Sequence, residues 1–218
     1  MKNFDIDYWM DGYTAKITSV FGERVRFIGI QGSQARGEAN ENSDIDVVLL
    51  LDRLDYADIK AYDLAVSDLP ERERLCGFLS GEDELRNWER SDLFQFYHDT
   101  RPLYGSIDWI AGLLTREDVR RAVHFAACNL YHMCIHNALH GKSEDDIRGM
   151  FKAAVFALQA KHYDETGEYI RKRADLAQNL AGDDREVLAY AMGKPGSFDE
   201  ISEFLLNWCR NIITEFRE

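Results

Sequence analysis

One stretch of the sequence restricts the fold of this chain more than any other. It runs from Gly32 to Asp46 and has a strand-like segment on each side. Residues 25–30 before it and Ile45–Leu51 at its end are rich in β-branched and aliphatic residues, as is typical of buried strands. A glycine–serine turn, Gly32-Ser33, therefore follows one predicted strand, and an Asp-x-Asp pair opens the next.

The glycine–serine turn has the composition of a phosphate-binding loop. Gly32 lets successive backbone N–H groups converge on an anion, and Ser33 adds a hydroxyl donor. Arg36 is a candidate for bidentate contact with a phosphate. If a helix begins near Gln34, its N-terminus also favours negative charge. The turn is therefore predicted to hold a triphosphate.

The acid pair consists of Asp44 and Asp46. Residues at i and i+2 of a strand point to the same face, so the two carboxylates lie side by side and repel each other unless a cation separates them. Mg²⁺ suits such a site, because it binds a few carboxylates together with phosphate oxygens. A lone Asp-x-Asp or a lone Gly-Ser is usually an ordinary strand edge or turn, so the prediction depends on their combination.

Residues Gly32–Asp46, followed by Val47-Val48-Leu49, resemble the signature of the polymerase-β-like nucleotidyltransferase superfamily. The segment Ala35–Ala39 is most similar to minimal and aminoglycoside nucleotidyltransferases, and Pro102–Gly105 is similar to the closing strand of that domain. The helical second half resembles the substrate-covering domain of kanamycin-type enzymes and the HEPN-like fold. The resemblance implies transfer of a nucleoside monophosphate, AMP being the first choice, from a Mg·NTP to a hydroxyl of a small acceptor.

The resemblance also assigns roles to single residues. It implies that Gly32 and Ser33 bind the triphosphate of ATP or another NTP. It implies that Asp44 and Asp46 hold Mg²⁺ and are catalytic. Arg36 joins the nucleotide-binding set through its expected phosphate contact.

A third acid is harder to place. Members of the superfamily often carry one on a later strand, as metal ligand or base, but the predicted third strand, Leu75–Leu79, contains none. The acids nearby are Glu71, Glu73, Asp83, Asp92, Asp99 and Asp108. Asp92 is the candidate if residues 93–97 form a strand. If they form a helix, Ser91 caps it and Asp92 is only a first-turn acid.

The fold class predicted is α+β. Residues 1–112 are expected to form a nucleotidyltransferase domain with a small mixed sheet and flanking helices, and residues 113–218 an all-α bundle that covers the substrate. Apolar residues at helical spacing predict helices over residues 6–20, 56–69, 117–140, 144–161 and 198–216, with shorter ones near residues 174 and 185. Gly141 is expected at the C′ position of the third helix, and Ser143 at the N-cap of the fourth.

Two groups of polar residues in the helical half could also belong to a functional site. The third helix carries polar residues four apart: His124, Cys128, His132, His136 and His140. Steps of four drift about 40° each around a helix, so these side chains cannot share one metal, and cleft-lining or half-buried histidines are favoured over a zinc site. Lys152 lies among apolar residues, where it either reaches a triphosphate or extends to solvent.

The overall charge limits the partners. The chain has 218 residues and a formal net charge of −13, which disfavours long nucleic acids and suits a cationic acceptor. No apolar run approaches the roughly 20 residues that cross a bilayer, and four scattered cysteines favour a reducing, cytoplasmic location. Two alternatives remain open, a degenerate nucleotide-binding module and an enzyme that transfers AMP to proteins. A homodimer also stays open.

Overall fold

The computed structural model describes residues 4–216. The chain divides into two compact units. The first unit ends at Glu89 and resumes over Phe96–Leu113, and the second comprises Arg90–Gln95 and the residues from Leu114 onward. The domain boundary between residues 112 and 113 remains a prediction, and the structure differs from it in grouping Arg90–Gln95 with the helical unit.

A four-stranded mixed sheet forms the centre of the first unit. Its strands are β1 (Val25–Ile30), β2 (Ile45–Leu51), β3 (Leu75–Gly81) and β4 (Arg101–Gly105), in the order β3-β2-β1-β4. β1 is antiparallel to β2 and β4, whereas β2 and β3 are parallel. All four strands lie where the sequence predicted them, and the α+β class is confirmed.

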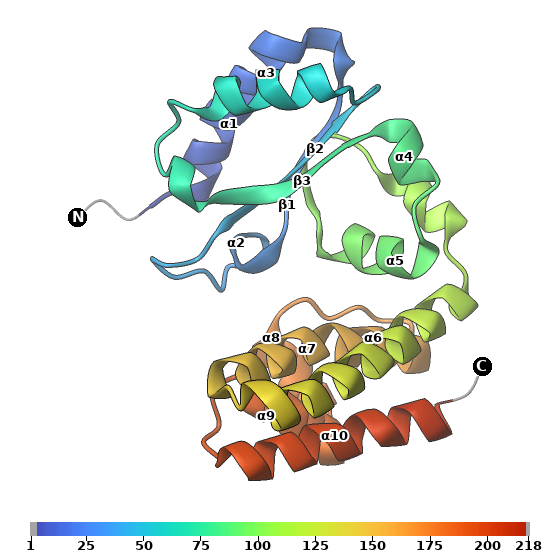
Figure 1. Ribbon diagram of the computed structural model, residues 1–218. Helices are drawn as coiled ribbons and strands as arrows, with labels where there is room; N and C mark the ends of the chain where they lie inside the picture. Colours follow the sequence, from blue (N-terminus) through green and yellow to red (C-terminus); the bar gives the residue numbers. More distant parts are fainter. Residues whose placement is uncertain (1–3, 217–218) are drawn as a thin grey trace. The chain divides into compact units, whose positions relative to one another are not determined.

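Two long helices cover one face of this sheet. α1 (Ile6–Phe21) and α3 (Tyr56–Val66) lie side by side (Figure 1). α1 begins at Asp5, whose side chain accepts from the first free N–H groups of the helix. Alternate residues of β2, namely Ile45, Val47 and Leu49, are fully buried against these helices. Asp46 lies between them in the sequence and therefore points to the opposite face.

Short helices and turns complete the first unit. They are the α-helices α2 (Gly32–Arg36) and α4 (Glu82–Arg86) and the 3₁₀ segments η1 (Gly22–Arg24), η2 (Arg72–Arg74) and η3 (Asp108–Leu113). α5 (Arg90–Asp99), whose first residues belong to the second unit, is a helix over residues 93–97, where the sequence left helix and strand open. Its last turn leads into β4, so residues 96–100 reach the end of β1 at which the predicted site lies.

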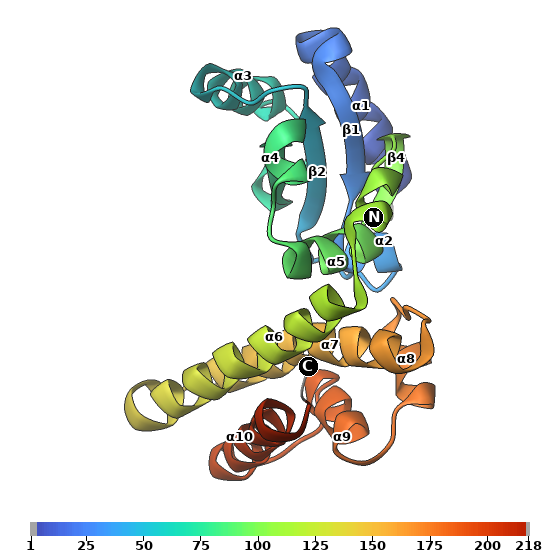
Figure 2. The same cartoon turned by 90° about the vertical axis from the view of Figure 1, so that its right-hand side faces the viewer.

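The second unit is all helical. It contains α6 (Arg116–His136), α7 (Glu144–Thr166), α8 (Arg173–Asn179), α9 (Gly182–Ala191) and α10 (Phe198–Glu215). α6 and α7 form a long antiparallel pair (Figure 2), and apolar faces of α9 and α10 pack against it. None of the helices within residues 4–216 combines the length and apolar character needed to cross a membrane.

The connection between α6 and α7 corrects one prediction. α6 ends at His136, and a π-type turn, η4 (Asn137–Gly141), follows it. The residue with positive φ is Lys142 and not Gly141. The Asn137 side chain exchanges two hydrogen bonds with the backbone of Ser143, at 2.9 and 3.0 Å, and so determines the path of the turn. Ser143 caps α7 as predicted.

Candidate active site

The predicted phosphate turn begins where β1 ends. The N–H of Gln31 donates to the carbonyl of Asp46 at 2.8 Å, which ties the turn to β2. Gly32 then adopts a φ of 66°, in the left-handed region that glycine enters without steric cost. α2 has only five residues. A phosphate bound here would therefore depend on the N–H groups of the turn and not on a helix dipole.

The carboxylate of Asp46 lies directly against Gly32. A Cβ atom on Gly32 would lie 2.1 Å from Oδ2 of Asp46, so a side chain there would displace the carboxylate. Asp46 is half-buried, and Asp44, immediately before β2, is exposed. The structure thus brings the turn and the second acid into contact, and the roles given to Gly32, Ser33, Asp44 and Asp46 stay predictions.

The charge on Asp46 is poorly compensated. Burial raises the pKa of its carboxyl, the neighbouring Asp44 and Asp99 raise it further, and Arg36 only partly opposes the rise. A cation between Asp44 and Asp46 would remove this repulsion, so the two carboxylates fit Mg²⁺. Within residues 4–216 no three His, Cys, Asp or Glu side chains form a metal-binding group. Mg²⁺ here would complete its coordination with phosphate oxygens and water.

Arg36 is engaged within the protein. Its Nη1 lies 3.1 and 3.2 Å from the two carboxylate oxygens of Asp99, and its Nε lies 3.1 Å from Glu38. The Arg36 and Asp99 side chains are only 8% and 7% exposed. Bidentate contact with a phosphate would require Arg36 to give up one of these partners, so the phosphate role of Arg36 stays a prediction.

The strand beside Asp46 offers no third acid. In the parallel pairing of β2 and β3, Asp46 lies opposite Cys76, which is exposed. Directly paired residues of neighbouring strands point to the same face, so a thiol stands beside the acid pair. Among the six candidates for the third acid, Asp99 is the one that the structure brings close enough to Asp46 to raise the pKa of its carboxyl.

The other acid candidates have ordinary surroundings. Asp92 is exposed in the first turn of α5, in agreement with the helical alternative for this segment. Asp108 is exposed and accepts a hydrogen bond from the Ser106 hydroxyl at 2.8 Å. Glu73 is exposed in η2. None of the three has a contact that marks it as a base.

The polar residues of α6 and α7 are also accounted for. His132 and His136 are exposed, with ring centroids 6.5 Å apart, and belong to no metal-binding group among the described residues. Lys152 is exposed, in agreement with the alternative in which its side chain extends to solvent. Lys161, which lies further along α7, forms an ion pair with Asp184.

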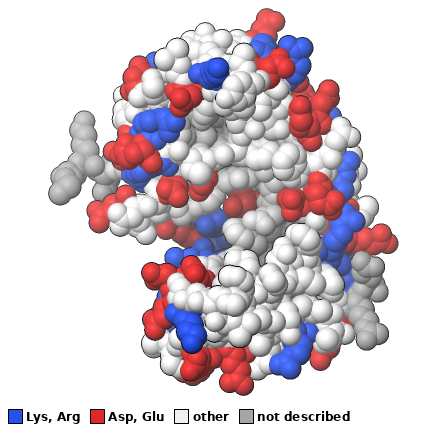
Figure 3. Space-filling model, in the orientation of Figure 1, with Lys and Arg blue, Asp and Glu red and all other residues white. Residues whose placement is uncertain are grey.

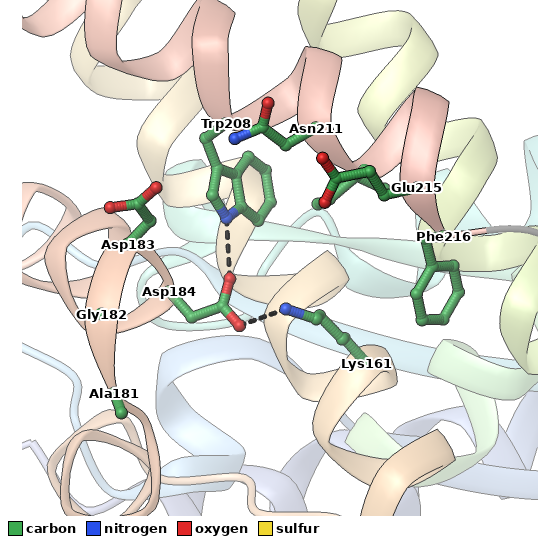
Figure 4. A pocket seen from close by; sticks show the side chains of 10 residues that line it. Lys161, Ala181, Gly182, Asp183, Asp184, Trp208, Asn211, Glu215 and Phe216 are labelled. Atoms are coloured by element: carbon green, nitrogen blue, oxygen red, sulfur yellow. Dashed lines mark hydrogen bonds and ion pairs between the residues drawn. The ribbon is translucent and has the colours of Figure 1, made fainter.

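That ion pair lies in a hollow of the helical unit, of about 610 Å³. Asp184 also accepts a hydrogen bond at 2.8 Å from the indole N–H of Trp208, so its charge has two partners (Figure 4). Asp183 and Glu215 line the same hollow and are exposed. The helical periodicity of residues 198–216 could not reveal this contact, because it depends on how α10 packs against α9 in the folded chain.

Comparisons with known proteins agree with the geometry. Residues 15–99 match the family described as "Nucleotidyltransferase domain". The fold resembles the crystal structure of spectinomycin adenyltransferase AAD(9) from Enterococcus faecialis with ATP and spectinomycin, with a TM-score of 0.62 and 13% sequence identity over 97% of this chain and 100% of that one. No curated protein matches the sequence. The matched residues contain the turn, the acid pair and Asp99, and this part of the chain is therefore similar to a nucleotidyltransferase domain of the polymerase-β type.

Proposed function

We propose that this enzyme transfers AMP from Mg·ATP to a hydroxyl group of a small, positively charged acceptor. The contact between Gly32 and the carboxylate of Asp46 carries the proposal, because it joins a phosphate-binding turn to a metal-binding acid. Neither feature alone specifies nucleotidyl transfer. Together they allow the triphosphate and its divalent cation to bind at the same end of the sheet.

The reaction assigned to this site is a single displacement. The acceptor oxygen bonds to the α-phosphorus while the bond from that phosphorus to the pyrophosphate oxygen breaks, and the hydroxyl proton passes to water. The N–H group and the hydroxyl of Ser33 orient the triphosphate beside the turn that Gly32 opens. Asp44 and Asp46 hold Mg²⁺, which when bound neutralises charge on the phosphate oxygens.

The acceptor class follows from charge and from the structural neighbour. The net charge of −13 attracts cations, and Figure 3 shows acidic and basic side chains interspersed mostly toward the edges of the visible face, with uncharged residues over much of its middle. AAD(9) is a spectinomycin adenyltransferase whose structure holds ATP and spectinomycin. At 13% identity this supports ATP as the donor and a hydroxylated cation as the acceptor without naming the compound. We place the reaction in the cytoplasm, where the four free cysteines stay reduced.

A second candidate is binding of the nucleotide without transfer. It is favoured by one observation, that Cys76 and not a carboxylate stands beside Asp46 on β3. A base typically contributes about 10² to 10⁴ in rate. A site without one can keep its affinity for Mg·ATP while it loses turnover.

The test follows the α-phosphate. The protein is incubated with Mg²⁺, ATP labelled at the α-phosphorus and single acceptors, namely spectinomycin, other aminocyclitols and neutral cyclitols, and the products are separated and weighed by mass spectrometry. The proposal expects label on a cationic acceptor in a one-to-one ratio with pyrophosphate. The Asp44→Asn/Asp46→Asn variant is the control, and it should bind no Mg·ATP while its circular dichroism stays unchanged.

Three results would contradict the proposed function. Tight Mg·ATP binding without transfer to any acceptor would favour the binding module. Label on protein instead of small molecules would indicate AMP transfer to side chains. Equal Mg·ATP affinity of the wild type and the double Asn variant would remove the assigned site.

A further inference from the structure

We propose that Asp99 is a positioning residue that holds the phosphate turn through Arg36. This inference rests on the proposed function. It assigns Arg36 an internal partner in place of a phosphate, and it gives a role to the buried acid that the proposed reaction leaves unused.

Three residues of the turn are attached to one short segment of the chain. Arg36 donates to both oxygens of Asp99, at 3.1 and 3.2 Å. The N–H of Gly32 lies 3.4 Å from Oδ2 of the same carboxylate. The Gln31 amide donates to the Thr100 hydroxyl at 2.7 Å. The beginning and the end of the turn are therefore both fixed by residues 99 and 100.

The charges around Arg36 and Asp99 show why neither side chain is available to bind a phosphate or a cation. Asp99 is buried close to Asp46, so an unpaired anion there would add to the repulsion that Asp44 already exerts on Asp46. Arg36 supplies the compensating charge and is itself buried, which makes separation of the pair unfavourable. The pair neutralises Asp99 and leaves Asp44 and Asp46 as the carboxylates able to bind a cation.

Asp99→Asn separates positioning from direct phosphate binding. If Arg36 were a phosphate ligand restrained by Asp99, the substitution would free Arg36, and Mg·ATP would bind equally well or more tightly. If Asp99 positions the turn, the substitution loosens it, and the dissociation constant of a non-hydrolysable Mg·ATP analogue should rise about tenfold or more. In the transfer assay the KM for ATP should rise more than kcat falls, because the reacting atoms are untouched.

Asp58→Asn is the matched control. Asp58 pairs with Arg24, Oδ1 to Nη1 at 2.7 Å, and its side chain is 11% exposed. Arg24 precedes β1, at the end opposite the turn. This control should lose stability and keep its affinity for the analogue. Restoration of affinity by Asp99→Glu, relative to Asp99→Asn, would further support the ion pair.

The outcomes are separable from those of the proposed function. Failure of the wild type to bind the Mg·ATP analogue would end both proposals. Normal wild-type binding with unchanged or tighter binding by Asp99→Asn would overturn the positioning role alone. Should Asp99→Asn not fold, Thr100→Val tests the neighbouring attachment of the turn, because it removes the hydroxyl that accepts from the Gln31 amide and donates to the Phe96 carbonyl. Several-fold weaker binding would support the positioning role, and unchanged binding would contradict it.

Discussion

Replacement of Gly32 by alanine is the sharpest perturbation that the structure offers. The φ of 66° is the left-handed conformation, which costs an L residue about 1–2 kcal/mol. In addition, the new Cβ would lie 2.1 Å from Oδ2 of Asp46, so the carboxylate must move by more than about 1 Å to reach normal contact distance. Mg²⁺ demands ligands within a narrow range of distances, so this displacement should remove Asp46 as a ligand.

Gly37→Ala separates the two effects. Gly37 has a φ of 71°, close to that of Gly32, and its added Cβ would meet no atom within 4 Å. Both variants should lose about 1–2 kcal/mol of stability, seen as a melting temperature lowered by about 2–8 °C. Only Gly32→Ala should weaken binding of a Mg·ATP analogue in calorimetry, by about 10- to 100-fold. Equal affinities of the two variants would refute the contact between the turn and the acid.

Three further predictions concern single groups. Asp46→Asn should abolish transfer of the α-phosphate and greatly weaken Mg²⁺-dependent ATP binding, while Mg²⁺-independent binding changes little; equal metal dependence in both proteins would contradict this. Arg24 lowers the pKa of Asp58 from 3.8 to about 2, so this carboxylate contributes stability that is fully present above pH 3.8 and is lost as the pH falls toward 2. The urea midpoints of wild type and Asp58→Asn should therefore differ at pH 7 and converge near pH 2. Trp208→Phe removes an indole N–H from the buried side of Asp184 and should cost about 1–3 kcal/mol in chemical unfolding; an unchanged midpoint would show that the hydrogen bond contributes nothing.

Elements with local signals could be predicted from the sequence. β2 was identifiable because Ile45–Leu51 is apolar except for Asp46, and α7 because Ser143 caps it. α5 was ambiguous, since the short, aromatic-rich run Leu93–Tyr97 fits a strand as well as a helix. The turn after α6 was assigned to Gly141 because glycine favours positive φ, but the side chain of Asn137 fixes the chain so that Lys142 takes that conformation. A single side chain overrode the general preference.

The residues of the candidate site also include some that the sequence could predict and some that it could not. Gly32 and Asp46 were recognisable because their spacing along the chain determines that they meet across β1 and β2. The partner of Arg36 was not, because Asp99 lies 63 residues away in the sequence and reaches the turn through the packing of α5 and β4. Asp99 was one of six candidate acids, and the sequence favoured Asp92 instead. Only burial and proximity in the folded chain distinguish it from Asp92 and Asp108.

The burial of Arg36 and Asp99 also limits how this sequence can diverge. Replacement of Asp99 leaves Arg36 with Glu38 as its remaining partner, and replacement of Arg36 leaves the buried charge of Asp99 without its ion-pair partner, which typically costs about 3–5 kcal/mol. That is a large fraction of the roughly 5–15 kcal/mol by which a domain is stable. Two neutral side chains of matching size could replace the pair at little cost, but only if both changes arise together. Positions 36 and 99 should therefore vary jointly among descendants of this chain, although nothing in the order of the sequence links them.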